Sequence, residues 1–231
     1  MSSIYLVDYY SNTIKSVVHQ ITVIPKIIFL LFVLFSVVIS KSLFNLILIF
    51  FVIAFLIVIA QLPLLKILKW SLYSAFFASL FAVSQIQYGL LPFQTMLKAI
   101  DAALLMLFVV CTTPYPALFS LFGKISTILA NVFFMTYRFF FLIIDEIQTK
   151  VMVLKIRGGY VGGPIKTLKN IGSTIGRLFI HSIERSEKLY DIMIIRGYRG
   201  VMFSRTTFRF RLFDLLLIGF GVLIFLIAII L

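Results

Sequence analysis

Residues 42–60 read SLFNLILIFFVIAFLIVIA, and no side chain in this stretch is charged. A bilayer hydrocarbon core about 30 Å thick is crossed by a helix of about 20 apolar residues. The stretch therefore predicts a membrane-spanning helix. Together with the apolar run at 24–40, from which it is separated at Lys41, it predicts a helical hairpin.

Three further apolar runs follow along the chain, at 70–83, 96–113 and 213–231. Pro63 interrupts the pattern before the first of them, and the pair Pro114 and Pro116 ends the second. No small-residue cleavage site follows the first run of the chain, so we expect a retained span and not a signal peptide. The fold class that we predict is an all-α, polytopic membrane protein with about five transmembrane helices and long amphipathic cytoplasmic helices.

The composition disfavours an ordinary soluble domain. Of the 231 residues, 62% are apolar and 13% are charged, whereas a soluble domain has roughly 25% charged residues. A soluble all-helical core is therefore the weaker alternative. The net charge of +13 is better explained by the retention of Lys and Arg beside membrane spans, or by contact with anionic lipid, than by nucleic acid.

The basic residues are distributed asymmetrically. From Lys150 to Arg211 there are thirteen Lys or Arg and three acidic residues. Because cytoplasmic segments retain basic residues, this segment is expected inside, with the N-terminus also inside and the C-terminus outside a prokaryotic cell membrane. Lys66 and Lys69 then fall in a cytoplasmic loop, and the loops at Lys41 and Tyr88 lie outside.

Three parts of the chain follow from this order. Residues 1–114 hold four transmembrane helices, residues 115–211 hold the coupling helices, and residues 212–231 hold the last span. Within the second part, the region 115–141 is apolar but carries recurring polar residues, so we expect long helices that run along or slide out of the inner leaflet. The turn-forming run 158–164 is expected to connect two helices.

The second cytoplasmic helix carries an apolar stripe at helical spacing, with Ser182 and Ser186 among its members. Such a stripe indicates packing against another protein segment. Its candidate packing residues are Ile175, Leu178, Phe179, Ile183, Leu189, Tyr190 and Met193.

Both cytoplasmic helices end in the same three residues. One ends Ile156-Arg157-Gly158 and the other Ile195-Arg196-Gly197, each followed within a few residues by Tyr and Gly. Gly just past a helix end closes the last turn in the left-handed conformation, and a cation suits the negative end of the helix dipole. Ordinary capping explains one such end, whereas the repetition favours a duplicated docking tip.

The segment 184–200, ERSEKLYDIMIIRGYRG, resembles the signature of the transmembrane (T) component of energy-coupling factor (ECF) transporters, the CbiQ/EcfT family. Three further stretches resemble family stretches in the same order: Ile24-Pro25-Lys26, Thr112-Thr113-Pro114 and Tyr137-Arg138-Phe139. The resemblance covers nearly the whole chain. In the family the tips usually read Ala-Arg-Gly, whereas here Ile156 and Ile195 stand in place of the Ala, which puts the fine packing of the tips in question.

The resemblance implies a scaffold subunit of an ATP-driven importer. Its coupling helices would rest on two ATP-binding-cassette ATPases and would also hold a separate substrate-binding membrane subunit (S component). Arg157, Gly158, Arg196 and Gly197 would be the ATPase-coupling residues, because an Arg at a protruding tip can form a bidentate pair with a carboxylate. The substrate would be a metal ion such as cobalt or nickel, or a vitamin, and the wording of segment 184–200 favours the cobalt-importer type.

The sequence gives little support for a nucleotide site, a metal site or a disulfide. Gly158 and Gly163 have the offset of a phosphate-binding loop, but Pro164 stands where its Lys is required, so we expect no nucleotide site, no catalytic activity and no cofactor. His19 and His181 lack clustered partners, and Cys111 has no second cysteine, so no metal site or disulfide is expected.

Two other functions remain as alternatives. Asp101 lies inside an apolar run and is a functional candidate by default, although Lys98 three residues earlier favours an ion pair. A self-contained secondary transporter would need several such intramembrane charges. A membrane enzyme would need convergent Asp, Ser or His groups on facing spans, which the sequence does not indicate.

Overall fold

The computed structural model describes residues 3–14, 16–85, 87, 89–123, 126–200 and 212–230. In this described part the secondary structure is helical and contains no strand. The predicted all-α fold class is thus confirmed. The predictions that fall on Tyr88, on Lys124 and on residues 201–211 lie outside the described residues.

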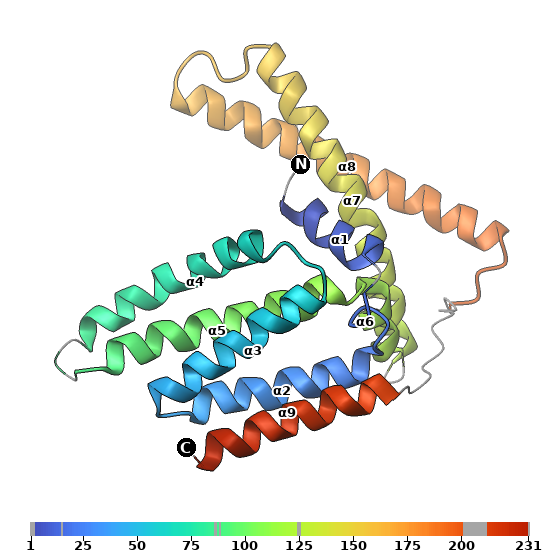
Figure 1. Cartoon of the computed structure of the whole chain (residues 1–231). Coiled ribbons are helices and arrows are strands. Elements are labelled where there is room, and N and C mark those ends of the chain that lie inside the picture. Colours follow the sequence, from blue (N-terminus) through green and yellow to red (C-terminus); the bar gives the residue numbers. More distant parts are fainter. Residues whose placement is uncertain are drawn as a thin grey trace. The chain divides into compact units, whose positions relative to one another are not determined.

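The chain divides into two compact units, residues 1–118 with 206–231 and residues 119–205. Helix α5 (Leu91–Thr112) is central in the first unit, because it packs against four other helices (Figure 1). These are α1 (Ser3–Thr13), α2 (Val23–Ile39), α3 (Leu43–Ile59) and α4 (Leu64–Ser84). The last helix, α9 (Leu212–Ile230), packs along α2 although nearly the whole chain separates them.

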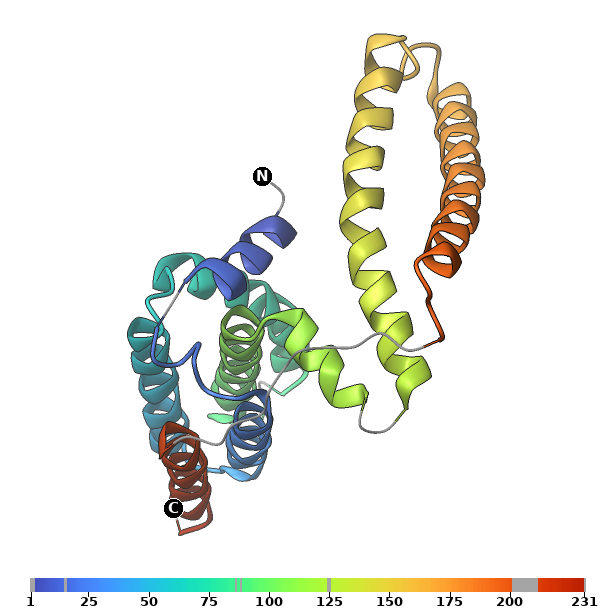
Figure 2. The ribbon, with the colours of Figure 1, turned by 90° about the vertical axis from the view of Figure 1, so that its right-hand side faces the viewer.

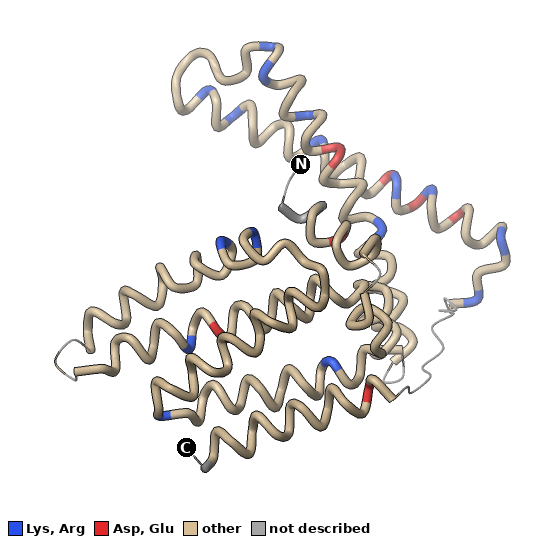
Figure 3. The backbone as a smooth tube through the Cα atoms, in the orientation of Figure 1, with Lys and Arg blue, Asp and Glu red and all other residues tan. Residues whose placement is uncertain are grey.

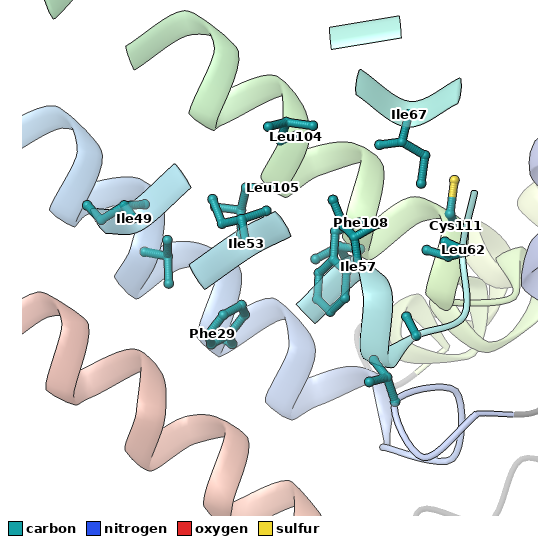
Figure 4. Close-up of a cluster of buried hydrophobic side chains, with 14 of the residues drawn as sticks. Phe29, Ile49, Ile53, Ile57, Leu62, Ile67, Leu104, Leu105, Phe108 and Cys111 are labelled. Atoms are coloured by element: carbon teal, nitrogen blue, oxygen red, sulfur yellow. The ribbon is translucent and has the colours of Figure 1, made fainter. Parts of the chain in front are cut away.

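The core of this unit lies where α2, α3 and α5 meet (Figure 4). Ile49, Ile53 and Ile57 recur at intervals of four residues on α3 and are fully or almost fully buried. Phe29 of α2 and Phe108 of α5 meet edge to face, with ring centroids 6.5 Å apart. One stripe of each helix therefore forms a packed interior.

Large apolar side chains also cover the outside of the helices. Phe51 and Phe55 of α3 are 66% and 65% exposed, and Phe81 of α4 is 72% exposed. Water would disfavour such a surface, whereas lipid tails solvate it. The chain is a multi-pass membrane protein.

Four described helices are long and apolar enough to cross a membrane, namely α4, α5, α7 (Thr127–Ile156) and α9. The apolar helices α2 and α3 are shorter, with 17 residues each. All five predicted runs lie in helices of the first unit. The count of five spans stays a prediction, since α7 also has the length and composition of a span.

One local prediction was wrong. Lys66 and Lys69 lie in the first turns of α4 and not in a loop. The chain turns earlier, where Gln61 adopts a φ of 58° and Pro63 occupies the N-cap of α4, so the helix begins directly after the proline.

The second unit is built on a helical hairpin, which Figure 2 shows from the side. Helix α7 runs for 30 residues, the connector follows, and α8 (Pro164–Ile195) runs back for 32 residues. The end of α6 (Tyr115–Phe122) joins this unit through stacking of Phe119 on Phe133, at 5.3 Å between ring centroids. The predicted connector at 158–164 is confirmed.

At the open end of the hairpin, Asn131 links the start of α7 to the segment that follows α8. Its Nδ2 donates hydrogen bonds to the Tyr198 hydroxyl, at 3.3 Å, and to the Gly200 carbonyl oxygen. Asn131 lies near the start of α7 and Tyr198 just past the end of α8. The two helices are therefore antiparallel over nearly their full length.

Candidate coupling surface

The two Arg-Gly ends have the same backbone geometry. Arg157 is the C-cap of α7 and Arg196 is the C-cap of α8, with φ, ψ of −76°, 7° and −81°, 8°. Gly158 and Gly197 follow in the left-handed region, with φ of 66° and 79°. A residue with a Cβ is strained in this region, which explains glycine at both positions.

The capping hydrogen bonds also match. In α7, Gly158 N donates to Lys155 O at 3.2 Å and Gly159 N donates to Leu154 O at 2.9 Å. The corresponding bonds in α8 join Gly197 N to Ile194 O and Tyr198 N to Met193 O, both at 2.9 Å. This pair of bonds is the Schellman motif, which satisfies carbonyls that a helix end leaves unpaired. The capping role predicted for both glycines is confirmed.

The two tips lie at opposite ends of the α7–α8 hairpin. Arg157 precedes the connector into α8, and Arg196 ends α8, which at about 1.5 Å per residue is on the order of 48 Å long. Both arginine side chains are exposed. Ile156 and Ile195 beside them are 78% and 84% exposed, so the larger side chain that replaces Ala adds apolar surface at each tip.

The predicted apolar stripe of α8 divides into two parts. Leu178, Leu189 and Met193 are half-buried on the side that faces α7. Its other members are largely exposed, at 50% to 64%, namely Ile175, Phe179, Ile183 and Tyr190. The described chain thus leaves half of the stripe uncovered between the two tips.

Charged residues follow both helices of the hairpin, as Figure 3 shows. Arg185 of α8 and Glu146 of α7 form an ion pair at 3.4 Å that links the helices. His181 lies 3.4 Å from Glu184 on the same helix, where both side chains are about half exposed. Neither contact reaches the two tips.

Two of the stretches that carry the family resemblance meet inside the first unit. Lys26 is 1% exposed, and its Nζ donates a hydrogen bond of 2.7 Å to the carbonyl oxygen of Thr112 at the end of α5. Removal of a charged group from water requires such a partner. The Ile-Pro-Lys stretch therefore fastens α2 to the Thr-Thr-Pro stretch.

A second buried charge was missed by the sequence analysis. Asp214 of α9 is fully buried, and its carboxylate accepts hydrogen bonds from Thr22 N at 3.0 Å and Thr22 Oγ1 at 3.1 Å. An anion at the N-terminal end of α2 is favoured by the helix dipole. An acid in the first turn of an apolar helix was the available signal, but its partner lies 192 residues away.

The predicted ion pair between Lys98 and Asp101 is absent from the described residues. Lys98 Nζ instead donates to the Val38 carbonyl oxygen at 2.9 Å, at the end of α2, where helix carbonyls lack intrahelical partners. Asp101 is fully buried, and among the described residues neither of its carboxylate oxygens has a hydrogen-bond partner. Residues at i and i+3 share a helix face, but Lys98 bonds to α2 and not to Asp101.

The connector does not have the form of a nucleotide loop. Pro164 begins α8, and no strand precedes Gly158, which instead follows the long helix α7. Within the described residues there is also no cluster of three or more His, Cys, Asp or Glu side chains.

Comparison with known proteins identifies the family. The chain is 32% identical over 117 residues to an uncharacterized protein of Methanocaldococcus jannaschii, a match that takes in 50% of this chain and 42% of that relative. A family model described as cobalt transport protein, CbiQ, matches residues 13–208, which include both Arg-Gly tips and the Lys26 and Thr112 stretches. The chain belongs to the CbiQ family of cobalt transport proteins.

Proposed function

We propose that this chain is the transmembrane coupling subunit of an ATP-driven importer of the ECF type. It would transmit the motion of two ATP-binding-cassette ATPases to a separate substrate-binding membrane subunit. The family is one of cobalt transport, so the cargo that we propose is a metal ion such as cobalt or nickel, with a vitamin as the alternative.

The observation that carries the proposal is the pair of identical tips. Arg157 and Arg196 have the same capped geometry, with exposed side chains, at the C-terminal ends of α7 and α8. Two copies of one ATPase present the same surface twice, and a subunit that meets both needs the same contact twice at a fixed separation. The antiparallel hairpin, in which α8 alone is on the order of 48 Å long, holds the two tips apart.

The uncovered part of the α8 stripe supports a third partner. Phe179 and Tyr190 are 64% and 59% exposed on a helix whose other face packs on α7. Side chains of this size contribute much of their energy when they become buried at an interface. We propose that this stripe packs against the substrate-binding subunit or against another coupling helix.

The proposed orientation places the hairpin and the N-terminus in the cytoplasm and the C-terminus outside. It rests on the excess of Lys and Arg in segment 150–211. The proposal also makes the chain non-catalytic, with ATP hydrolysed by the partner subunits.

Co-purification from the native host in a mild detergent tests the proposal. We expect the chain to bring down two ATP-binding-cassette subunits and a small membrane protein, and we expect the isolated chain to hydrolyse no ATP. The variant Lys166→Gln removes the Lys that lies nearest to the mimicked phosphate loop and should change nothing. Recovery of the chain without any ATPase, or hydrolysis by the isolated chain that Lys166→Gln abolishes, would contradict the proposal.

A self-contained secondary transporter is the second candidate, and Asp101 is the observation that favours it. A fully buried carboxyl group without a partner among the described residues is the kind of group that ion pathways use. The purified chain in vesicles, without ATPases, separates the two candidates. Uptake of Co²⁺ driven by an ion gradient alone, and lost in Asp101→Asn, would establish the second candidate.

A further inference from the structure

We propose that the closed end of the α7–α8 hairpin holds a binding site for a phosphate group. A partly open cavity of about 450 Å³ lies between the two helices there. Its lining comes from the last turns of α7, the connector and the first half of α8. This site goes beyond the proposed coupling function, with which it shares only Arg157.

The lining is cationic on both helices. Lys150 and Arg157 of α7 lie seven residues apart and so share one face, and Arg177 of α8 faces them across the cavity. None of the described residues that line the cavity is acidic. Among the residues that the structure describes, no ion pair or side-chain hydrogen bond neutralises any of these three cations.

These three charges repel one another across the cavity. A cavity of about 450 Å³ is on the order of 10 Å across, which is close to the Debye length at physiological ionic strength. Salt therefore screens the cations from one another incompletely. An anion with more than one negative charge relieves the repulsion. A phosphate group can also accept two parallel hydrogen bonds from one guanidinium group.

From Lys150 to Ile183 the chain has six basic residues and no acidic one. Glu146 lies one turn before Lys150, but it already forms the ion pair with Arg185. Figure 3 shows only basic positions around the closed end of the hairpin, whereas acidic positions begin farther along the helices. The helix dipoles also give no net charge here, since the end of α7 contributes about half a negative charge and the start of α8 about half a positive one.

The uncharged part of the lining fixes the shape of the site. Asn170 Nδ2 donates to the Gly159 carbonyl oxygen at 2.9 Å, which joins α8 to the connector beneath the cavity. The hydroxyls of Thr149 and Thr174 donate to backbone carbonyls of their own helices, at 2.9 and 2.8 Å. Ser173 Oγ has no partner among the described residues and can donate to a bound oxygen.

The same phosphate chemistry has two sources, the headgroup of an anionic lipid and a small soluble phosphate compound. Basic clusters beside membrane helices attract anionic lipid, which favours the first source. The cavity admits either. The test therefore has one arm for each source, and both arms use the full-length chain.

In the lipid arm, the chain is placed in nanodiscs of phosphatidylcholine with or without phosphatidic acid, and retained lipid is counted by native mass spectrometry. In the soluble arm, the chain in a neutral detergent is titrated with inorganic pyrophosphate, and binding is measured by isothermal titration calorimetry. The test variant is Lys150→Gln with Arg177→Gln, and the matched control is Lys155→Gln with Lys169→Gln. The control pair removes the same charge from the same two helices, but neither of its residues lines the cavity.

We expect the test variant to lose about tenfold in affinity for each cation removed, while the control pair binds as the unaltered chain does. Lys150→Arg with Arg177→Lys keeps the charges and should retain most of the binding. Helix content from circular dichroism shows that each variant is folded. Binding in the lipid arm alone assigns the site to a lipid headgroup, and binding in the pyrophosphate arm alone assigns it to a soluble phosphate.

Two results would overturn the site: absence of binding in both arms, or an equal loss in the test and control pairs, which would show attraction by net charge only. The outcome is separable from that of the coupling proposal, because the test variant leaves the tip residues Arg157, Gly158, Arg196 and Gly197 unchanged. ATPase co-purification with the variant that carries both Lys150→Gln and Arg177→Gln measures the coupling function independently of phosphate binding.

Discussion

Thr22 and Asp214 join the N-terminal ends of α2 and α9, with both oxygens of the Asp214 carboxylate bonded to the one threonine. The Thr22 amide and hydroxyl donate at 3.0 and 3.1 Å, so Asp214 satisfies an amide that the start of α2 would leave unpaired. This contact holds the start of α9 against the start of α2, and the two helices pack along each other from this point.

Asp214→Ala should destabilise the first unit by about 2 kcal/mol, because it leaves two partly buried donors on Thr22 without this acceptor. Asp214→Asn keeps one oxygen acceptor and should cost less. Thermal unfolding in detergent can be followed by a thiol-reactive dye, since Cys111, the chain's one cysteine, is buried until the unit opens. Asp191→Ala removes an exposed acid from α8 and is the control; an equal effect of both alanine variants would contradict the prediction.

Acid should weaken the first unit through His19. Burial, and secondly the nearby charge of Lys26, lower the pKa of His19 below its usual value of 6.5, while its Nδ1 lies 2.7 Å from Ser16 Oγ. Because the unfolded chain then takes up the proton first, His19 contributes its full stabilisation above pH 6.5 and loses it as the pH falls through the lowered pKa. Melting temperatures across this range should fall in the unaltered chain and fall less in His19→Gln; parallel curves would exclude His19 as the cause.

Charge reversal at the tips should weaken ATPase recruitment before it affects folding. Arg157→Glu or Arg196→Glu loses a dipole interaction of about 0.3–1 kcal/mol, whereas a broken interface charge pair costs about 2–5 kcal/mol. The double variant should be worse than either single one, and Arg→Lys should be partly impaired because Lys lacks the bidentate fork. Co-purification and transport are the measurements, with Lys188→Glu, two turns before the end of α8, as the control. Normal recruitment by the double Glu variant would leave the tips as helix caps alone.

The cap glycines should be intolerant of alanine for a purely conformational reason. Gly197 has a φ of 79°, and an added Cβ would meet nothing within 4 Å, so Gly197→Ala pays only the left-handed backbone cost of about 1–2 kcal/mol. Gly172 also has open space but lies inside α8, where Gly172→Ala should stabilise the helix by about 0.5–1 kcal/mol. Opposite shifts in hairpin stability, measured by chemical denaturation, are expected, and shifts of the same sign would contradict the cap assignment.

Reporter fusions should place Leu231 outside the cytoplasm and Gly162 inside it, because basic residues cluster between Lys150 and Arg211. The Gly162 reporter also decides whether α7 is a span, since a crossing by α7 would move the connector to the outer side. A cytoplasmic C-terminus would overturn the count of five spans.

The sequence by itself determined the helical membrane fold and the positions of the tips, because both depend on local chemistry. Uncharged apolar runs such as residues 42–60 are stable as helices only where lipid solvates them. Gly after Arg at 157–158 and 196–197 indicates a helix end whatever surrounds it. Both features can be recognised within a few turns of chain.

Only the tertiary structure decided which distant groups meet. Lys26 could have been a boundary residue, yet it is buried against Thr112, and Asp214 finds its donors at Thr22. Lys98 has the right spacing for an ion pair with Asp101, but its Nζ donates a hydrogen bond to a carbonyl oxygen of α2 instead. Helix periodicity fixes the face on which a side chain lies, whereas the partner opposite that face depends on how the helices pack. For the same reason the sequence alone does not indicate the cationic cavity, because Lys150 and Arg177 line it together only in the folded hairpin.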